Sequence, residues 1–261
     1  CGAAARGIRV AFAGAVGEDA LGRFVTDELA AHGVDTSGIR FEPGRPTGAS
    51  IVLKRGDQEA VLSSVGTVAS FAGDDVERVA LRSARHVHVA SYFLQDGLRP
   101  ALPGLFEEAH AAGTTTSIDP NRDPAGEWDK GLLDLLSSTD ILFANSSEVR
   151  AITGVDDVDI AAEALAERGA VVVVKFLQGG GLATWGDEMV RSETIPTTVT
   201  DTTGAGASFA AGFVAGRLEG WSLDRCLALA VACASLSSRG LGGTASQPTM
   251  DEALAALEAT A

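Results

Sequence analysis

VTDTTGAGASFAAGF, residues 199–213, places a polar glycine turn directly before an apolar helix. The N–H groups at the start of such a helix, from Gly204 to Ala207, have no partners inside it, and the helix dipole is positive there. Glycines at 204 and 206 let the backbone approach an anion closely. The turn therefore suits a phosphate, or the charge that develops during phosphoryl transfer. A helix cap with glycines for packing stays open as the plainer interpretation.

Strands and helices alternate along most of the chain. An apolar run at residues 8–13 and an amphipathic stretch at 19–32 predict a strand followed by a helix. Later strands and helices are predicted at 86–90, 98–112, 115–118, 128–136, 141–143, 146–153, 160–168 and 171–175, and three final helices at 205–218, 222–239 and 250–259. Repeated units of this length imply a mostly parallel sheet with helices on both faces.

A different pattern occupies residues 38–64. Short alternating segments at 47–53 and 59–63, joined by a polar stretch, predict a β-hairpin that stands off the main body. The chain contains no internal repeat or linker. We therefore expect a single α/β domain over residues 1–261 with a small β appendage.

Composition excludes several classes of function. The chain has 261 residues with 35 Asp and Glu against 20 Lys and Arg, and a formal net charge of −15. Nucleic acids and anionic membrane surfaces are disfavoured as partners, because binding to phosphates needs a basic face. Apolar stretches fall short of the ~18–20 residues that span a bilayer. The three cysteines, Cys1, Cys226 and Cys233, are too few for a disulfide framework and fit a reducing cytoplasm.

Other enzyme motifs do not occur with the required spacing. The chain has no P-loop, no Gly-x-Ser-x-Gly elbow and no Gly-x-Gly-x-x-Gly after an early strand. His86 and His88 share one face of a predicted strand, but no third metal ligand is apparent, so a half-exposed strand face is the expectation.

Residues 201–209, DTTGAGASF, resemble the C-terminal signature of the ribokinase family (PfkB-type carbohydrate kinases), D-T-T-G-A-G-D-x-F, at every position but one. Residues 14–22, GAVGEDALG, are similar to an early turn of that family, and Asp119-Pro120-Asn121-Arg122 and Asn145-x-x-Glu148 resemble two later motifs. The motifs occur in the family's order over essentially the whole chain. The resemblance implies a ribokinase-like three-layer α/β/α sandwich with a mostly parallel central sheet and a small β lid at about residues 38–65.

The resemblance also implies an activity, in which the γ-phosphate of ATP passes to a hydroxyl of a small sugar or keto-deoxy sugar acid. It further allows for a monovalent cation near residues 201–206 and for a homodimer. By position, the catalytic turn would be Gly204, Ala205, Gly206 and Ala207, the substrate contacts Asp119, Asn121 and Arg122, the Mg²⁺ residues Asn145 and Glu148, and the nucleotide contacts Lys175, Gly179, Asp201, Thr203, Gly240 and Gly242.

Several positions depart from the family pattern. Ala207 stands where the family has the aspartate that takes the proton, and general-base assistance contributes about 10² to 10⁴ in rate. Leu177 stands in a glycine place, and the family's first core strand and first lid strands have no counterpart, so the chain is expected to begin inside the helix that follows them. The chain is thus expected to be inactive or strongly impaired, or else a non-catalytic pseudokinase that binds sugar or nucleotide.

Three explanations for Ala207 remain open: an engineered substitution, a naturally inactive relative, and a chemistry that uses another base.

Overall fold

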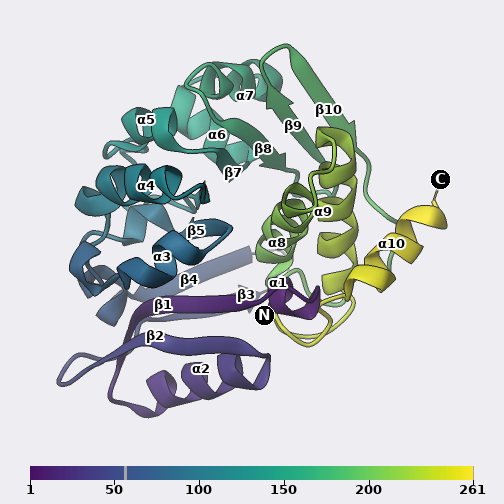
Figure 1. Ribbon diagram of the computed structural model, residues 1–261. Helices are drawn as coiled ribbons and strands as arrows, with labels where there is room; N and C mark the ends of the chain where they lie inside the picture. The colour runs from purple at the N-terminus through teal and green to yellow at the C-terminus, as the bar shows by residue number, and fades with distance from the viewer. Residues whose placement is uncertain (56–57, 261) are drawn as a thin grey trace.

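A six-stranded sheet forms the centre of the computed structural model, which describes residues 1–55 and 58–260 (Figure 1). The strand order is β10-β9-β8-β7-β6-β5. Strands β5 to β8 run parallel, whereas β9 and β10 are antiparallel. The strands are β5 (His86–Ala90), β6 (Thr115–Asp119), β7 (Ile141–Asn145), β8 (Val171–Lys175), β9 (Gly181–Trp185) and β10 (Glu188–Ser192). The predicted, mostly parallel sheet is confirmed, and β9 and β10 are additions that the sequence pattern did not predict.

Helices cover both faces of this sheet and make three layers (Figure 1). In β8, Val172 and Val174 pack into the core on one face, and Val171 and Val173 pack into the core on the other. A parallel strand buried on both faces needs such a continuous apolar run. The first face carries α3 (Arg78–Ser83), α4 (Leu102–Ala111), α5 (Leu132–Leu135), α6 (Ser146–Thr153) and α7 (Val158–Ala166).

The second face carries the two longest helices of the described chain, α8 (Ala205–Leu218) and α9 (Leu223–Ser237), and α10 (Met250–Glu258) packs on α9. The prediction for residues 205–218 is confirmed to the residue. Gly212 lets α8 lie close to α9, because a β carbon there would sit 2.9 Å from Cys233 Sγ and 3.0 Å from Ala230 Cα. Small residues at this contact therefore set the position of α8 against the sheet.

The helix predicted at 128–136 is shorter in the structure. Trp128 and Lys130 have positive φ angles of 58° and 48°, so a right-handed helix cannot include them. Buried Asp123 holds this segment by accepting bonds from the N–H of Trp128, at 3.0 Å, and from Lys130 Nζ, at 2.9 Å. Burial acts to raise the pKa of Asp123, but these donors outweigh it and lower that pKa to about 2. An irregular loop anchored on a carboxylate thus takes the place of the first half of the predicted helix.

The N-terminal part forms a separate unit beside the main sheet (Figure 1). Strands β1 (Val10–Gly17) and β2 (Val34–Glu42) pair in parallel and flank α2 (Ala20–Ala31), and a short helix, α1 (Gly2–Ala5), precedes them. Asp19 caps α2 through Gly22 N at 2.8 Å and also accepts from Thr47 N at 2.8 Å. Hydrogen bonds from Thr47 and Gly22 lower the pKa of Asp19 to about 2. This carboxylate therefore ties α2 to the segment that leads into the hairpin.

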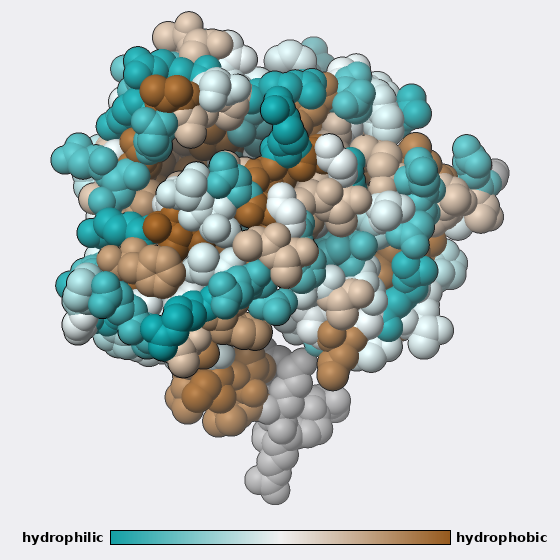
Figure 2. Space-filling view, turned by 60° about the horizontal axis from the view of Figure 1, so that its bottom comes forward, coloured by the Kyte–Doolittle hydropathy of each residue, from teal (hydrophilic) through white to brown (hydrophobic). Residues whose placement is uncertain are grey.

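The predicted hairpin consists of β3 (Ala49–Arg55) and β4 (Gln58–Ser64), paired antiparallel with Ile51 opposite Leu62. Ile51, Leu53 and Leu62 are exposed, at 60%, 51% and 59%, and hydrophobic surface gathers at the lower end of Figure 2. Of the range predicted as a lid, residues 38–42 belong to β2, and residues 56 and 57 lie outside the described residues.

Candidate functional site

The turn before α8 presents free backbone donors. Gly204 is the N-cap with φ +80°, and Asp201 closes the turn by accepting from the N–H of Thr203 at 2.9 Å. The N–H of Ala205 is used inside the turn, because it donates to Thr202 O at 3.1 Å. Within residues 1–55 and 58–260, the N–H groups of Gly206 and Ala207 donate to no acceptor. Two exposed amides at the positive end of a 14-residue helix make an anion site.

The loop that contains Gly240 and Gly242 lies against this turn. Asp201 holds the two together, because its second carboxylate oxygen accepts from Gly242 N at 2.9 Å. The contact is close, since a β carbon on Gly204 would lie 2.7 Å from Gly243 Cα. The structure therefore brings together four of the residues predicted to border the nucleotide: Asp201, Thr203, Gly240 and Gly242.

An ion pair lies next to the turn, at the carboxyl ends of two parallel strands. Asp119 ends β6 and Lys175 ends β8, on either side of β7. Lys175 Nζ contacts Asp119 Oδ2 at 2.5 Å, with the two side chains only 15% and 17% exposed. The same Nζ lies 3.7 Å from the place that a β carbon on Gly206 would occupy. A positive charge thus stands beside the free amides of α8, at the edge where α/β sheets bind ligands.

Asn145 and Glu148, the predicted Mg²⁺ residues, form a capping box at the start of α6. Asn145 Oδ1 accepts from Glu148 N at 2.9 Å, and Glu148 Oε2 accepts from Asn145 N at 2.8 Å. Burial raises the pKa of Glu148, and the negative charge of Asp119 adds to this increase, whereas the Asn145 amide and Lys175 oppose it. A cation close to Glu148 would oppose this increase, because an opposite charge favours the ionised carboxylate.

The Glu148 carboxylate fits Mg²⁺. In proteins this ion usually binds to one or two carboxylates together with substrate phosphates, rather than to a cage of protein ligands alone. Among the described residues, no group of three or more His, Cys, Asp or Glu side chains could hold a metal by itself. Glu148 would therefore hold the ion only with oxygens of a bound nucleotide.

Asn121 and Arg122 follow β6 on a tight turn. Asn121 has φ +57° and donates from Nδ2 to Ser91 Oγ at 3.2 Å, while Ser91 has φ +56°. Arg122 is exposed. Paired left-handed residues of this kind often mark functional loops. The geometry leaves the Arg122 guanidinium available to a carboxylate or phosphate of a substrate.

The turn after β8 accommodates Leu177 at the position where the family pattern has glycine. Leu177 is 78% exposed and does not adopt a positive φ, whereas Gly179 does, at +91°. A glycine is therefore not required at 177, and the leucine side chain points away from the packed core.

Arg6 is a site residue that the sequence reasoning missed. It is only 6% exposed, and it donates to Ser208 Oγ and to Cys233 Sγ, each at 2.9 Å. Burying a guanidinium is costly unless its N–H groups are bonded, and these contacts supply partners. The result is a positive charge beneath the first turn of α8, which the sequence signalled only as a lone arginine in a run of alanine and glycine.

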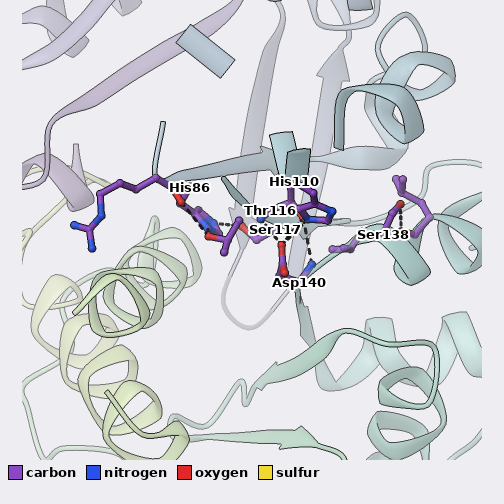
Figure 3. A network of polar contacts seen from close by, with 10 residues as sticks. His86, His110, Thr116, Ser117, Ser138 and Asp140 are labelled. Atoms are coloured by element: carbon purple, nitrogen blue, oxygen red, sulfur yellow. Dashed lines mark hydrogen bonds and ion pairs between the residues drawn. The ribbon is translucent and has the colours of Figure 1, made fainter. Parts of the chain in front are cut away.

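A polar network at the opposite, amino ends of the strands does not belong to this site (Figure 3). His86 Nε2 and His88 Nδ1 each lie 2.7 Å from Ser117 Oγ, and His110 Nε2 lies 2.8 Å from Asp140 Oδ2. Burial lowers the pKa of His86 to about 3, so this imidazole is neutral at pH 7. Both imidazoles of β5 are thus hydrogen-bonded to one hydroxyl. His86 is half-buried and His88 is exposed, in agreement with the predicted half-exposed strand face.

A cavity of about 540 Å³ lies beside this network and includes Arg82, Arg85 and Arg217 in its lining. It is bordered by the C-terminal ends of α3 and α8, where carbonyls carry the negative end of the helix dipole. Arg85 donates from Nη2 to Leu218 O. Arg82 pairs with Glu108 at 3.4 Å. Arg85 and Arg82 thus have partners here, and phosphate binding is favoured at the other edge of the sheet.

Comparisons with known proteins show the family and the fold of this chain. Residues 1–250 match the sequence model described as pfkB family carbohydrate kinase. An ATP-dependent ribose-1-phosphate kinase from Halopiger xanaduensis is 32% identical over 246 residues, which cover 94% of this chain and 79% of that protein. A 2-dehydro-3-deoxygluconokinase from Thermoproteus tenax is 30% identical over 263 residues, 97% of this chain and 81% of that protein. A crystal structure from E. coli, solved with ATP and Mg²⁺, has a TM-score of 0.87 at 24% identity and covers 99% of this chain and 86% of that one.

Proposed function

Because the chain belongs to the PfkB family of carbohydrate kinases, we propose that it binds ATP with Mg²⁺ and transfers the γ-phosphate to a hydroxyl of a small sugar or keto-deoxy sugar acid. One observation carries the proposal: the free amides of Gly206 and Ala207 lie beside the ammonium of Lys175, whose Nζ is 3.7 Å from the place of a β carbon on Gly206. That arrangement is suited to the charge on a phosphoryl group in transfer.

The proposed roles of the remaining site residues follow from where they lie relative to these amides and Lys175. Asp201 fixes the turn and the Gly240–Gly243 loop as one unit, which would border the nucleotide together with Thr203 and Gly179. Asp119, Asn121 and Arg122 would contact the acceptor at the end of β6. Mg²⁺, when bound near Glu148, supplies charge neutralisation to the phosphates. A monovalent cation near the turn at 201–206 is part of this proposal.

Ala207 limits the rate. It is exposed at the start of α8, and its methyl group accepts no proton. General-base assistance is worth about 10² to 10⁴ in rate, roughly 3 to 5 kcal/mol of barrier. We therefore expect slow turnover with intact nucleotide binding. The missing carboxylate also supports a second candidate, a non-catalytic relative that binds nucleotide or sugar without transfer.

The proposal also includes a homodimer and a cellular compartment. The exposed apolar face of the β3–β4 hairpin, with Ile51, Leu53 and Leu62, supports a homodimer through the lid. All three cysteines are free, which supports a reducing compartment such as the cytoplasm. The described chain contains no helix of the length and apolarity that crossing a membrane requires.

The test is ADP release over a panel of sugars, sugar acids and nucleosides, with the unaltered chain and Ala207→Asp compared at equal concentration. Slow turnover of one acceptor class, raised by about 10² to 10⁴ in Ala207→Asp, supports the kinase. ATP binding without turnover in either protein, measured by calorimetry, would instead support the non-catalytic relative.

A further inference from the structure

Transfer of a phosphoryl group to a hydroxyl releases a proton, and this chain has no carboxylate at position 207 to receive it. This inference rests on the proposed kinase function. If the chain turns over at all, another group near the start of α8 accepts the proton or leaves it to water. Within residues 1–55 and 58–260, three carboxylates lie around the turn: Asp119, Glu148 and Asp201.

Two of these carboxylates are committed to structure. Asp201 accepts bonds at both oxygens, from Thr203 on one and from Gly242 on the other. Glu148 is 6% exposed and closes the capping box of α6 through Oε2. Neither is placed to face a substrate hydroxyl without breaking the local fold.

Asp119 differs from both. Its Oδ2 contacts Lys175 Nζ at 2.5 Å, and in the described part of the chain its Oδ1 accepts no hydrogen bond. Lys175 Nζ in turn lies 3.7 Å from the place of a β carbon on Gly206, the neighbour of Ala207. The ion pair with Lys175 therefore places the Asp119 carboxylate near the start of α8, and Lys175 fixes its orientation.

We propose that Asp119, held by Lys175, accepts the proton of the acceptor hydroxyl in this chain. The acceptor oxygen attacks the γ-phosphorus and forms the new P–O bond. The bond from that phosphorus to the β,γ-bridging oxygen breaks, and ADP leaves with the electron pair. The hydroxyl proton passes to Asp119 Oδ1, while Lys175 stays protonated and faces the transferred group.

A base that lies less close to the acceptor hydroxyl than residue 207 suffices for slow turnover. The transition state of phosphoryl transfer is loose, with little bond formation to the attacking oxygen, so positioning and charge stabilisation carry most of the catalysis. Asp119 thus supplies the remaining base assistance, and an aspartate at 207 would make it dispensable.

A double-mutant cycle in kcat tests this assignment. The four proteins are the unaltered chain, Asp119→Asn, Ala207→Asp and the combination, with Asp187→Asn as a control carboxylate in the exposed β9–β10 turn. We expect Asp119→Asn alone to lower kcat about 10- to 100-fold, within the range of base catalysis. In the Ala207→Asp background the same change should lower kcat less than about threefold, because the proton has another acceptor. The Asp187→Asn control should not change kcat.

The outcomes separate a proton acceptor from a binding or structural residue. If Asp119→Asn raises KM and leaves kcat unchanged, or lowers kcat equally in both backgrounds, the proposal is overturned. Turnover by Ala207→Asp with none by the unaltered chain also overturns it. Absence of turnover in both, with ATP bound, is the separate failure of the kinase function itself.

Discussion

At Gly204, both the backbone conformation and the nearby atoms oppose replacement by any other residue. Its φ of +80° lies in the left-handed region, which costs a non-glycine residue about 1–2 kcal/mol. A β carbon there would also lie 2.7 Å from Gly243 Cα and 2.8 Å from Gly243 O, both backbone atoms of the loop held by Asp201. Gly204→Ala therefore has two effects together: it strains the backbone at residue 204, and it displaces the Gly240–Gly243 loop.

We predict that Gly204→Ala loses about 2–3 kcal/mol of stability, since displacement of packed backbone adds to the dihedral strain. For a domain of this size, each kcal/mol corresponds to roughly 2–4 °C in Tm, so the melting temperature should fall by about 4–12 °C. ATP affinity should fall at least about tenfold, because the amides of the turn move with the loop. Thermal unfolding and calorimetry measure the two effects.

Gly206→Ala is the matched control. A β carbon at 206 meets no atom closer than Lys175 Nζ at 3.7 Å, so stability should hold or rise by about 0.5–1 kcal/mol. ATP affinity should still fall about tenfold, since the methyl group enters the space assigned to a phosphate. An unchanged Tm in Gly204→Ala, or full ATP affinity in Gly206→Ala, would refute the reasoning about this turn.

Two further predictions concern stability. Asp123→Asn should destabilise the protein at neutral pH, and its difference from the unaltered chain should shrink as pH falls from about 4 towards 2. The sign follows because the pKa of Asp123 is lowered from 3.8 to about 2, so its contribution is present above the unfolded pKa and is lost on protonation; urea unfolding at several pH values measures it. Gly212→Ala should destabilise by about 1–3 kcal/mol through overpacking against Cys233 and Ala230, whereas Gly104→Ala, in open space on α4, should stabilise by about 0.5–1 kcal/mol. Equal melting temperatures for these two variants would contradict the account of the α8–α9 contact.

Local sequence patterns predicted the parts of the fold that depend on local order. The run of four valines from Val171 to Val174 predicted β8, and the polar turn before an apolar stretch predicted α8 to the residue. Strands β9 and β10 escaped prediction because each has only five residues of mixed character. Their antiparallel pairing depends on the tertiary contact with β8 and α9.

In the site, too, features with a local sequence pattern could be predicted and tertiary contacts could not. The positions of several motif residues could be predicted, because Asp119 and Lys175 lie at strand ends and Asn145 lies at a helix start. The pairing of Asp119 with Lys175 could not, since 56 positions separate them and the contact exists only because β6 and β8 both flank β7. The buried contact of Arg6 with Ser208 spans 202 positions and has no periodic signal at all.

Backbone amide NMR of the ¹⁵N-labelled chain during titration with ATP and Mg²⁺ tests the central claim most directly. The account predicts that the N–H signals of Gly206 and Ala207 shift most strongly, because these donors are free in the described structure and would bond a phosphate. ATP binding that leaves both signals in place, with shifts gathered instead around Arg85 and Arg217, would contradict it.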